Sequence, residues 1–455
     1  MLTIIILFLT ALVTLFVAFA KKPILTLSVS IIGLVATGAS LICQMNHPSN
    51  FLSSYEGIRM DEFAIRFSLV AVIFTGLLIL TGFDSFKARL EHVGDYIGLL
   101  LFSLFGAVVM VSFTDMFMFF LGLEILSIPI YVMAGVKKDD SLSSEASLKY
   151  FMTGAFATGI LLFGIAWLYG ATGSFKIDEI QLFFEEAESI SSLAYVGVLL
   201  ILASFLFKIG AAPFHFWSPD VYDGAPSTVT GFMAAVVKLG AFGAFIKLFS
   251  IAFGHLYDFW MPVLAILAIL TMFVGNLSAL RQVRFKRLLA YSSIAHVGYS
   301  LITMIVLTSN SASNLWFYLV AYGFSTIALI TVQLIVNDRE DRIEAFKGLG
   351  RSNPFVAFVA VLALLGLAGV PPLMGFFGKY LIFVDAITTN PALIIVALLN
   401  SGIGIYYYLR TVVIILQKPE GDVEIETPSF KATPLQLLVL LVCAIGIIFG
   451  GGLLL

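Results

Sequence analysis

The sequence predicts an all-α polytopic membrane protein with about 14 transmembrane helices, from its composition and from the length of its apolar runs. Of its 455 residues, 60% are hydrophobic and only 12% are charged, whereas soluble domains are about 25% charged. Apolar runs of roughly 20 residues, the length that crosses a bilayer, follow one another along the chain. The gaps between them leave no room for a soluble domain.

The predicted spans begin at the first residues. The run MLTIIILFLTALVTLFVAFAKK has neither a basic start nor a small-residue cleavage site, so we expect a retained span and not a removed signal. The acidic stretch GSFKIDEIQLFFEEAESISS (173–192) predicts an amphipathic surface segment. The predicted spans are 3–20, 24–44, 64–83, 94–112, 114–135, 148–170, 192–215, 226–250, 259–279, 286–306, 313–336, 354–387, 392–416 and 433–454.

The basic residues test this topology. If the N-terminus lies outside, 18 of the 25 Lys and Arg residues fall in inner loops and four in outer ones. Basic residues are enriched in inner loops, so both termini are expected on the outer side. The inner set is Lys21, Lys22, Lys87, Arg89, Lys137, Lys138, Lys149, Arg281, Arg284, Lys286, Arg287, Arg339, Arg342, Lys347, Arg351, Arg410, Lys418 and Lys431. The outer set is Arg59, Arg66, Lys176 and Lys247. The remaining three are Lys208, Lys238 and Lys379.

These three lysines lie inside predicted spans and are the first candidates for a functional site. A charge at the bilayer centre costs about 2.5–3.5 kcal/mol on insertion scales and is tolerated where it faces a partner or a water-filled cavity. Lys247 lies near a helix end and fits a snorkelling side chain instead. Glu124 is the only carboxylate well inside a predicted span. We therefore expect it to pair with Lys208, whose proton affinity would fall whenever the two separate.

Two predicted spans contain proline-bearing breaks, GAAPF (210–214) and GLAGVPPLMG (366–375). Proline removes a backbone donor and clashes with the preceding turn, so the helix is expected to open there. Unwound backbone at membrane depth is tolerated where it is buried in protein or lines water. Lys208 precedes the first break and Lys379 follows the second. Two interrupted spans in corresponding places predict an inverted repeat, the architecture of many transporters.

Further titratable groups lie near these breaks. Histidine titrates near neutrality and can relay protons, which makes His215, at the first break, and His296 candidates, although a simple hydrogen-bonding role is open for both. Asp385 falls near a helix end, where a solvated carboxylate is expected. Loop and helix-cap positions are expected for Asp220, Tyr222 and Asp223.

Several classes of protein are excluded. The net charge of −3 argues against nucleic-acid binding through a basic patch. Cys43 and Cys443 both lie in apolar stretches and make no disulfide or metal framework. The sequence has no phosphate-binding glycine motif, no metal-ligand cluster and no nucleophile with a plausible base. We expect no redox centre and no bound cofactor or metal in this chain.

Three motifs carry a family resemblance: PFHFWSPDVYDGAPS (213–227), KRLLAYSSIAHVGY (286–299) and GVPPLMGFFGK (369–379). They resemble the proton-translocating antiporter-like subunits of respiratory complex I, over essentially the whole chain. The Val221-Tyr222 pair and the Gly-Ala-Pro-Ser run at 224–227 are similar to the N-type subunits of NADH-quinone oxidoreductase. Lys379 also favours the N type over the M type, which typically carries glutamate there.

The resemblance implies a fold of two inverted five-helix repeats with broken helices 7 and 12. It places helices 1–3 in 1–93, the repeats in 94–252 (helices 4–8) and 253–416 (helices 9–13), and helix 14 in 417–455. It implies proton-transfer roles: Glu124 as the partner of Lys208, Lys238 as the link to the membrane centre, and Lys379 as the exit-side or coupling lysine. His215 and His296 lie in matching motifs and carry over as weaker candidates.

The predicted function is that of a proton-translocating membrane subunit of NADH-quinone oxidoreductase, an enzyme whose other subunits oxidise NADH and reduce quinone. The resemblance implies partners: an M-type subunit, small membrane subunits, and indirectly a hydrophilic arm that carries FMN and iron–sulfur clusters. The expected location is a bacterial inner membrane, in contact with the lipid bilayer. Two alternatives stay open: a multisubunit cation/proton antiporter of the same fold, and a scaffold whose polar residues stabilise subunit contacts.

Overall fold

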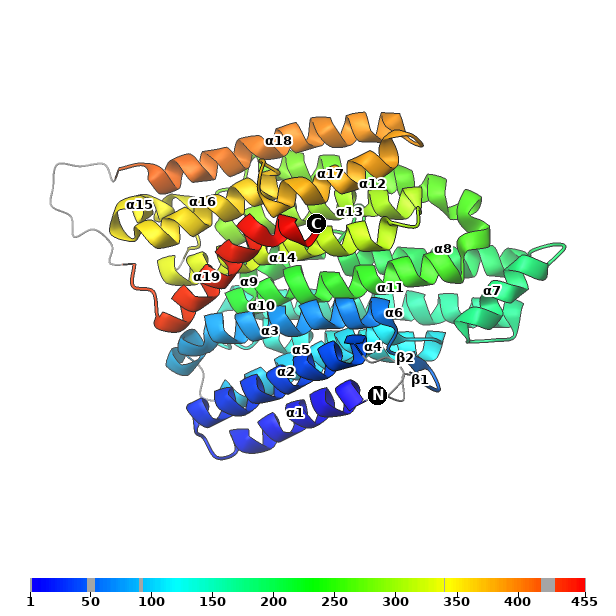
Figure 1. The fold of residues 1–455 in the computed structure, drawn as a ribbon, viewed down its shortest axis with the longest axis horizontal. Coiled ribbons are helices and arrows are strands. Elements are labelled where there is room, and N and C mark those ends of the chain that lie inside the picture. The colour runs from blue at the N-terminus through cyan, green and yellow to red at the C-terminus, as the bar shows by residue number, and fades with distance from the viewer. Residues whose placement is uncertain (1, 47–53, 90–92, 339, 419–429, 455) are drawn as a thin grey trace.

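The protein is a single bundle of helices that run nearly parallel to one another (Figure 1). The structure, a computed structural model, describes residues 2–46, 54–89, 93–338, 340–418 and 430–454. Arg339, one of the predicted inner basic residues, and most of the 417–432 connection lie outside these ranges. The segments α7 and β1–β2 lie at one end of the bundle and α15 lies at the other (Figure 1).

The helices and strands follow one another along the chain in two halves of similar length. The first half contains α1 (Leu2–Ala18), α2 (Pro23–Asn46), β1 (Ser54–Tyr55), β2 (Ile58–Arg59), α3 (Glu62–Arg89), α4 (Val93–Ser112), α5 (Met116–Ala134), α6 (Ser141–Thr172), α7 (Ile177–Glu186), α8 (Ser192–Ile209), α9 (Trp217–Gly224), α10 (Ser227–Phe232), η2 (Met233–Val237) and α11 (Lys238–Ile251). The second half contains η3 (Gly254–Leu256), α12 (Tyr257–Ala279), α13 (Phe285–Val306), α14 (Ser311–Val336), η4 (Ile343–Phe346), α15 (Leu349–Ser352), α16 (Pro354–Ala368), α17 (Met374–Ile387), α18 (Pro391–Leu416), α19 (Pro434–Phe449) and η5 (Gly450–Leu454).

The prediction of about 14 spans is confirmed. Within the described residues, 12 helices are long and apolar enough to cross a membrane, and α1 and α16 are shorter apolar helices. The pair α16–α17 forms the predicted span 354–387, and α10, η2 and α11 together form the span 226–250. The acidic segment becomes α7, whose Ile177, Ile180 and Phe184 are buried.

The helix boundaries follow from local sequence signals. Asp115 caps α5 by accepting a hydrogen bond from the Met118 amide at 2.7 Å, the usual role of a short polar side chain before the first turn. Pro434 begins α19 after Thr433, and Thr433 and Gln436 form a capping box. Such caps satisfy the backbone donors that the first turn of a helix leaves free.

Glycines allow two pairs of neighbouring helices to pack backbone against backbone. A Cβ atom at Gly106 of α4 would lie 2.2 Å from the Leu126 amide nitrogen of α5. A Cβ atom at Gly275 of α12 would lie 2.4 Å from the Ala295 amide nitrogen of α13. Small residues at close helix crossings are the rule inside membranes, where the lipid supplies no hydrophobic drive for helix association.

The boundaries 1–93, 94–252, 253–416 and 417–455 for the repeats and flanking helices stay a prediction.

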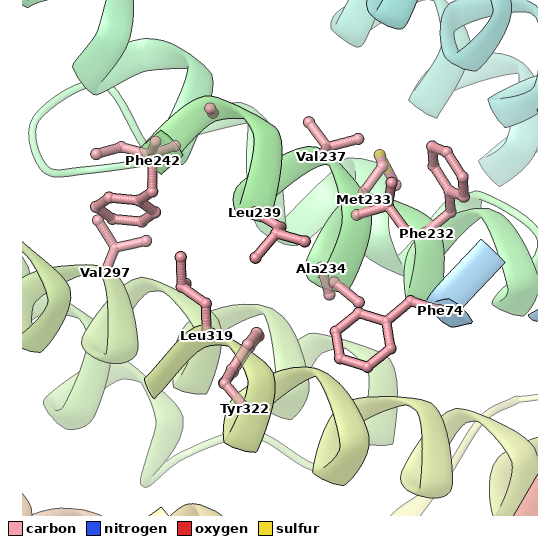
Figure 2. Close-up of a cluster of buried hydrophobic side chains, with 14 of the residues drawn as sticks. Phe74, Phe232, Met233, Ala234, Val237, Leu239, Phe242, Val297, Leu319 and Tyr322 are labelled. Atoms are coloured by element: carbon pink, nitrogen blue, oxygen red, sulfur yellow. The ribbon is translucent and has the colours of Figure 1, made fainter. Parts of the chain in front are cut away.

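The segment α10–η2–α11 occupies the centre of the bundle, and every residue from Ser227 to Phe249 is buried. In Figure 2, Phe242 of this segment lies beside Val297 of α13, and Ala234 and Leu239 point toward apolar side chains of α3 and α14. An apolar packing layer therefore surrounds the segment that carries Lys238.

Candidate proton-transfer site

The break after α8 positions Lys208. The helix ends at Ile209 because Gly210 adopts a left-handed backbone (φ +76°), and its amide bonds back to Leu206 and Phe207. The freed backbone groups are satisfied: Trp217 donates to the Phe207 carbonyl at 3.1 Å, and the Ala212 amide donates to Thr271 at 3.0 Å. The ammonium of Lys208 thus lies in the last turn of α8, where the helix dipole favours a positive charge.

Lys208 does not contact Glu124 directly. Its Nζ donates to the Ser127 Oγ of α5 at 2.6 Å and lies 5.7 Å above the Tyr150 ring. Glu124, half-buried one turn before Ser127, accepts a hydrogen bond from Thr158 of α6 at 2.7 Å. The two charges still interact electrostatically. The structure therefore replaces the expected close ion pair with a hydrogen bond from Lys208 to Ser127 and a longer-range attraction to Glu124, so the separation of the two charges is set by helices α5 and α8.

Lys238 begins α11 directly after a turn of π-helix, η2. Its Nζ donates to the Ser293 carbonyl at 2.9 Å and to the Ser293 hydroxyl, and it lies 5.7 Å above the Tyr322 ring. Its side chain is 6% exposed. A π-turn inside a helix interrupts the regular α-helical pattern of backbone hydrogen bonds and is common at functional positions. It aims the Lys238 side chain at α13.

His296 lies one turn further along α13 and joins two phenols. Its Nδ1 is 2.6 Å from the Tyr318 hydroxyl and its Nε2 is 3.0 Å from the Tyr408 hydroxyl. Tyr408 also contacts Ser292, the neighbour of the serine that holds Lys238. Both Lys238 and Lys379 interact electrostatically with the imidazole. This hydrogen-bonded run of hydroxyl and imidazole groups extends from the surroundings of Lys238 toward Lys379, and such groups can each accept and donate a proton.

The second break positions Lys379. The helix α16 ends at Ala368 because Gly369 is left-handed (φ +84°), which leaves the last carbonyls of the helix free. Lys379, on α17, reaches back and donates to the Leu367 and Ala368 carbonyls, each at 3.0 Å, and to Ser401 at 3.1 Å. Lys208 and Lys379 differ in position relative to their breaks: Lys208 belongs to the last turn of α8, whereas Lys379 reaches the carboxyl end of α16 from the following helix.

The other candidates from the sequence lie outside the series formed by Lys208, Lys238, His296 and Lys379. The Nδ1 of His215 is buried and makes no hydrogen bond with any described residue. Asp385 accepts bonds from Asn314 at 2.6 Å and Thr308 at 3.0 Å, as a capped group near a helix end. Lys247 is 8% exposed, and its Nζ lies 3.3 Å from the Val111 carbonyl and 3.8 Å from Asp61, so it ends on an ion pair at the helix terminus.

Sequence reasoning missed an ion network at the end of the bundle where α13 begins. The SPDVYDG segment forms the helix α9, not a loop, and Asp220 pairs with Lys149 at 2.6 Å and with Arg287 at 2.8 Å. Burial raises the pKa of Asp220, but its hydrogen bonds to the two cations outweigh this and hold the pKa below its usual range. The acids and bases of this network are far apart in sequence, and periodicity gives no signal of their pairing.

Among the described residues, no group of three or more His, Cys, Asp or Glu side chains could hold a metal ion. Lysines, tyrosines and a histidine with hydroxyl partners can instead bind, hold and pass protons. A bundle with two broken helices and buried lysines at both breaks defines an antiporter-like membrane transport subunit.

The chain belongs to the NADH:quinone oxidoreductase/Mrp antiporter transmembrane family, whose sequence model matches residues 114–404. It is 39% identical over 424 residues to the NADH-quinone oxidoreductase subunit N of Cytophaga hutchinsonii, covering 92% of this chain and 91% of the relative. It is 38% identical over 428 residues to the subunit N of Trichlorobacter lovleyi, covering 93% and 87%. The expected resemblance to antiporter-like, N-type subunits is confirmed.

Solved structures agree with this family. A chain of respiratory complex I from Thermus thermophilus superimposes with a TM-score of 0.85 at 30% identity, over 99% of this chain and 96% of that one. A chain of the Mrp complex from Dietzia sp. superimposes with a TM-score of 0.85 at 20% identity, over 98% and 95%. The second likeness shows the shared fold alone.

Proposed function

We propose that this chain is the proton-translocating N-type membrane subunit of an NADH-quinone oxidoreductase. The observation that carries the proposal is the line of buried groups from Lys208 through Lys238 and His296 to Lys379. The N-type relatives match nearly the full chain. NADH oxidation and quinone reduction take place on other subunits, which hold FMN, iron–sulfur clusters and the quinone site. This chain supplies a proton path in a bacterial inner membrane, with both termini on the outer side.

The proton moves because the charges along the line are coupled. The Lys208 ammonium is stabilised by Glu124 at longer range and by Ser127 in direct contact. A change at Glu124 weakens that stabilisation and makes the loss of a proton from Lys208 more favourable. Tyr222 faces the hydroxyls of both Ser218, next to the first break, and Ser293, which holds Lys238. It therefore links the segment after the first break to the serine that holds Lys238. His296 and the surrounding tyrosines continue the line to Lys379.

The face formed by α5 and α6 is where a neighbouring membrane subunit binds. Glu124 is only half-buried there, and α6, whose Thr158 holds it, exposes Phe156 (73%) and Leu148 (63%). A carboxylate that bordered lipid would be costly, so a polar surface of a partner must cover it. An M-type or a small membrane subunit of the complex fits this position, and its charge would act on Glu124 and thus on Lys208.

The fold also suits a multisubunit cation/proton antiporter, as the likeness to the Mrp chain indicates. Purification of the detergent-solubilised assembly that carries an affinity tag on this chain separates the two functions. We expect bound flavin and NADH:quinone oxidoreductase activity in the assembly. An intact assembly without flavin and without NADH oxidation would contradict the proposal and favour the antiporter, with sodium or potassium exchange as the next assay.

A further inference from the structure

A cavity of about 970 Å³ opens at the end of the bundle where α13 begins, the end that the basic residues predict to face inward. It lies between the ends of α3, α5 and α14 and the starts of α4, α6, α10 and α13. Exposed residues such as Lys138 and Asp139 lie at its mouth, and Asp223 lies deep within it. This volume is large enough for many water molecules.

Asp223 presents an unused oxygen in this cavity. Its side chain is 3% exposed, and its Oδ2 lies 3.1 Å from Arg284 and 3.8 Å from Arg287. Its Oδ1 has no hydrogen-bond partner among the described residues, and neither have Arg284 Nε and Gln333 Oε1, two further groups of the same cavity. Buried polar atoms are almost always paired. Three buried, unpaired atoms among the residues that line one roomy cavity therefore mark the place where water entering from the cavity would find hydrogen-bond partners, at Asp223.

The charges of the cavity favour cations. It is lined by six carboxylates and four basic side chains. The acidic members are Asp95, Asp139, Asp140, Asp223, Asp338 and Asp341, and the basic ones are Lys137, Lys138, Arg284 and Lys286. Burial raises the pKa of Asp223, and Arg284, Lys286 and Arg287 lower it only in part, so the pKa stays above its usual range. Asp220, its acidic neighbour on α9, acts in the same direction as burial.

A short dry gap separates the cavity from Lys238. Tyr222 follows Val221 in α9 and is adjacent to Asp223, and it faces Ser293, the serine that accepts from Lys238. A second, smaller void lies here between Tyr222, Thr230, Ser292 and Tyr322, and it has no space for a water molecule. Apolar side chains, among them Ala234 and Leu319, pack around this segment (Figure 2). The open space of the cavity therefore ends near Asp223, and Tyr222 lies between it and the serine that holds Lys238.

We propose that Asp223 collects protons from the inner aqueous phase and that Tyr222 controls their passage to Lys238. This inference rests on the proposed function and names its uptake site. In the step, the O–H bond of protonated Asp223 breaks, and an N–H bond forms on neutral Lys238 through a transient hydroxyl and water chain. The Asp223 carboxylate then takes a proton from the cavity water. The salt bridge to Arg284 holds the carboxylate in place between cycles.

The test uses the whole complex in inverted membrane vesicles, where NADH-driven proton uptake is followed from pH 6 to pH 9. We expect Asp223→Asn to lower the uptake rate on the order of tenfold, with the loss growing as the pH rises. The sign follows because the variant must take protons directly from water, where they become scarcer at high pH. Asp223→Glu should restore the rate. The control Glu340→Gln changes an exposed carboxylate outside the cavity lining that pairs with Arg342 at 3.2 Å, and it should leave the rate and its pH profile unchanged.

Chemical rescue separates proton collection from a merely structural role. Millimolar formic acid, small enough to enter the cavity, should restore proton uptake by Asp223→Asn. Normal uptake with a wild-type pH profile in Asp223→Asn, or a loss that neither Asp223→Glu nor formic acid repairs, would overturn the inference. Lys238→Met distinguishes the two levels of the argument. If that variant also pumps normally, the proposed function itself fails; if it stops pumping while Asp223→Asn does not, only the uptake site is wrong.

Discussion

Replacing Lys208 with methionine is expected to abolish most NADH-driven proton translocation while the complex still assembles. Methionine fills a similar volume without the charge, so the packing around the first break survives. The change removes the ammonium group that contacts Ser127, interacts with Glu124 at longer range and exchanges protons with the other groups of the path. We expect the pumping rate to fall on the order of tenfold or more, as when a proton-transferring group is deleted. Fluorescence quenching of a pH-sensitive dye in inverted vesicles measures it.

Lys247→Met is the matched control for this experiment. Lys247 is also a buried lysine of a membrane helix, but its ammonium ends on Asp61 and the Val111 carbonyl. Its removal should leave the pumping rate close to that of the wild type in assembled complexes. Equal losses of pumping in both variants would mean that the buried lysines support the structure of the subunit. The hypothesis of a scaffold would then replace that of a proton path.

Gly106→Ala is expected to cause a large loss of stability for the addition of a single methyl group. The added Cβ would lie 2.2 Å from the Leu126 amide nitrogen, and a backbone atom cannot turn aside as a side chain can. The helices α4 and α5 would have to separate, which also strains the hydrogen bond from Ser103 to the Leu126 carbonyl at 2.6 Å. Overpacking of this kind costs roughly 1–3 kcal/mol or more. The midpoint of thermal unfolding of the purified assembly should fall.

Gly402→Ala provides the comparison. Gly402 is also a helix-interior glycine, on α18, away from the α5–α6 face, and no atom outside its own helix lies within 4 Å of the position where a Cβ would be placed. Alanine is a better helix former by about 1 kcal/mol, so this variant should match or exceed the wild-type midpoint. If Gly106→Ala melted with the wild type as well, the close backbone contact between α4 and α5 would be wrong.

Much of the fold could be predicted because each membrane-spanning helix must be apolar over about 20 consecutive residues, which is visible in the local composition. Apolar runs of span length located the membrane helices, and the Gly and Pro residues at 210–213 and 369–372 located both breaks. The three lysines Lys208, Lys238 and Lys379 could be isolated because a charge inside an apolar span is conspicuous. These are signals within 20 residues of sequence, and they require no knowledge of tertiary packing.

The contacts of the site could not be predicted in the same way. The direct partner of Lys208 is Ser127, a small hydroxyl residue on another helix, and no charge rule singles it out. The π-turn at Met233–Val237 carries no proline and no unusual polar residue. Asp223 resembled a loop residue because the cations that hold it come from α13, about 60 positions away. Such pairings arise only when the bundle has formed, so they depend on packing and not on local pattern.

The central claim is that the charged line inside this chain carries protons. Its most direct test is the number of protons moved per NADH oxidised by proteoliposomes that contain the assembly with Lys238→Met. The account predicts a lower number, or complete loss of coupled turnover, while the oxidation of NADH by ferricyanide stays at the wild-type rate. An unchanged number of protons per NADH at wild-type quinone turnover would contradict it.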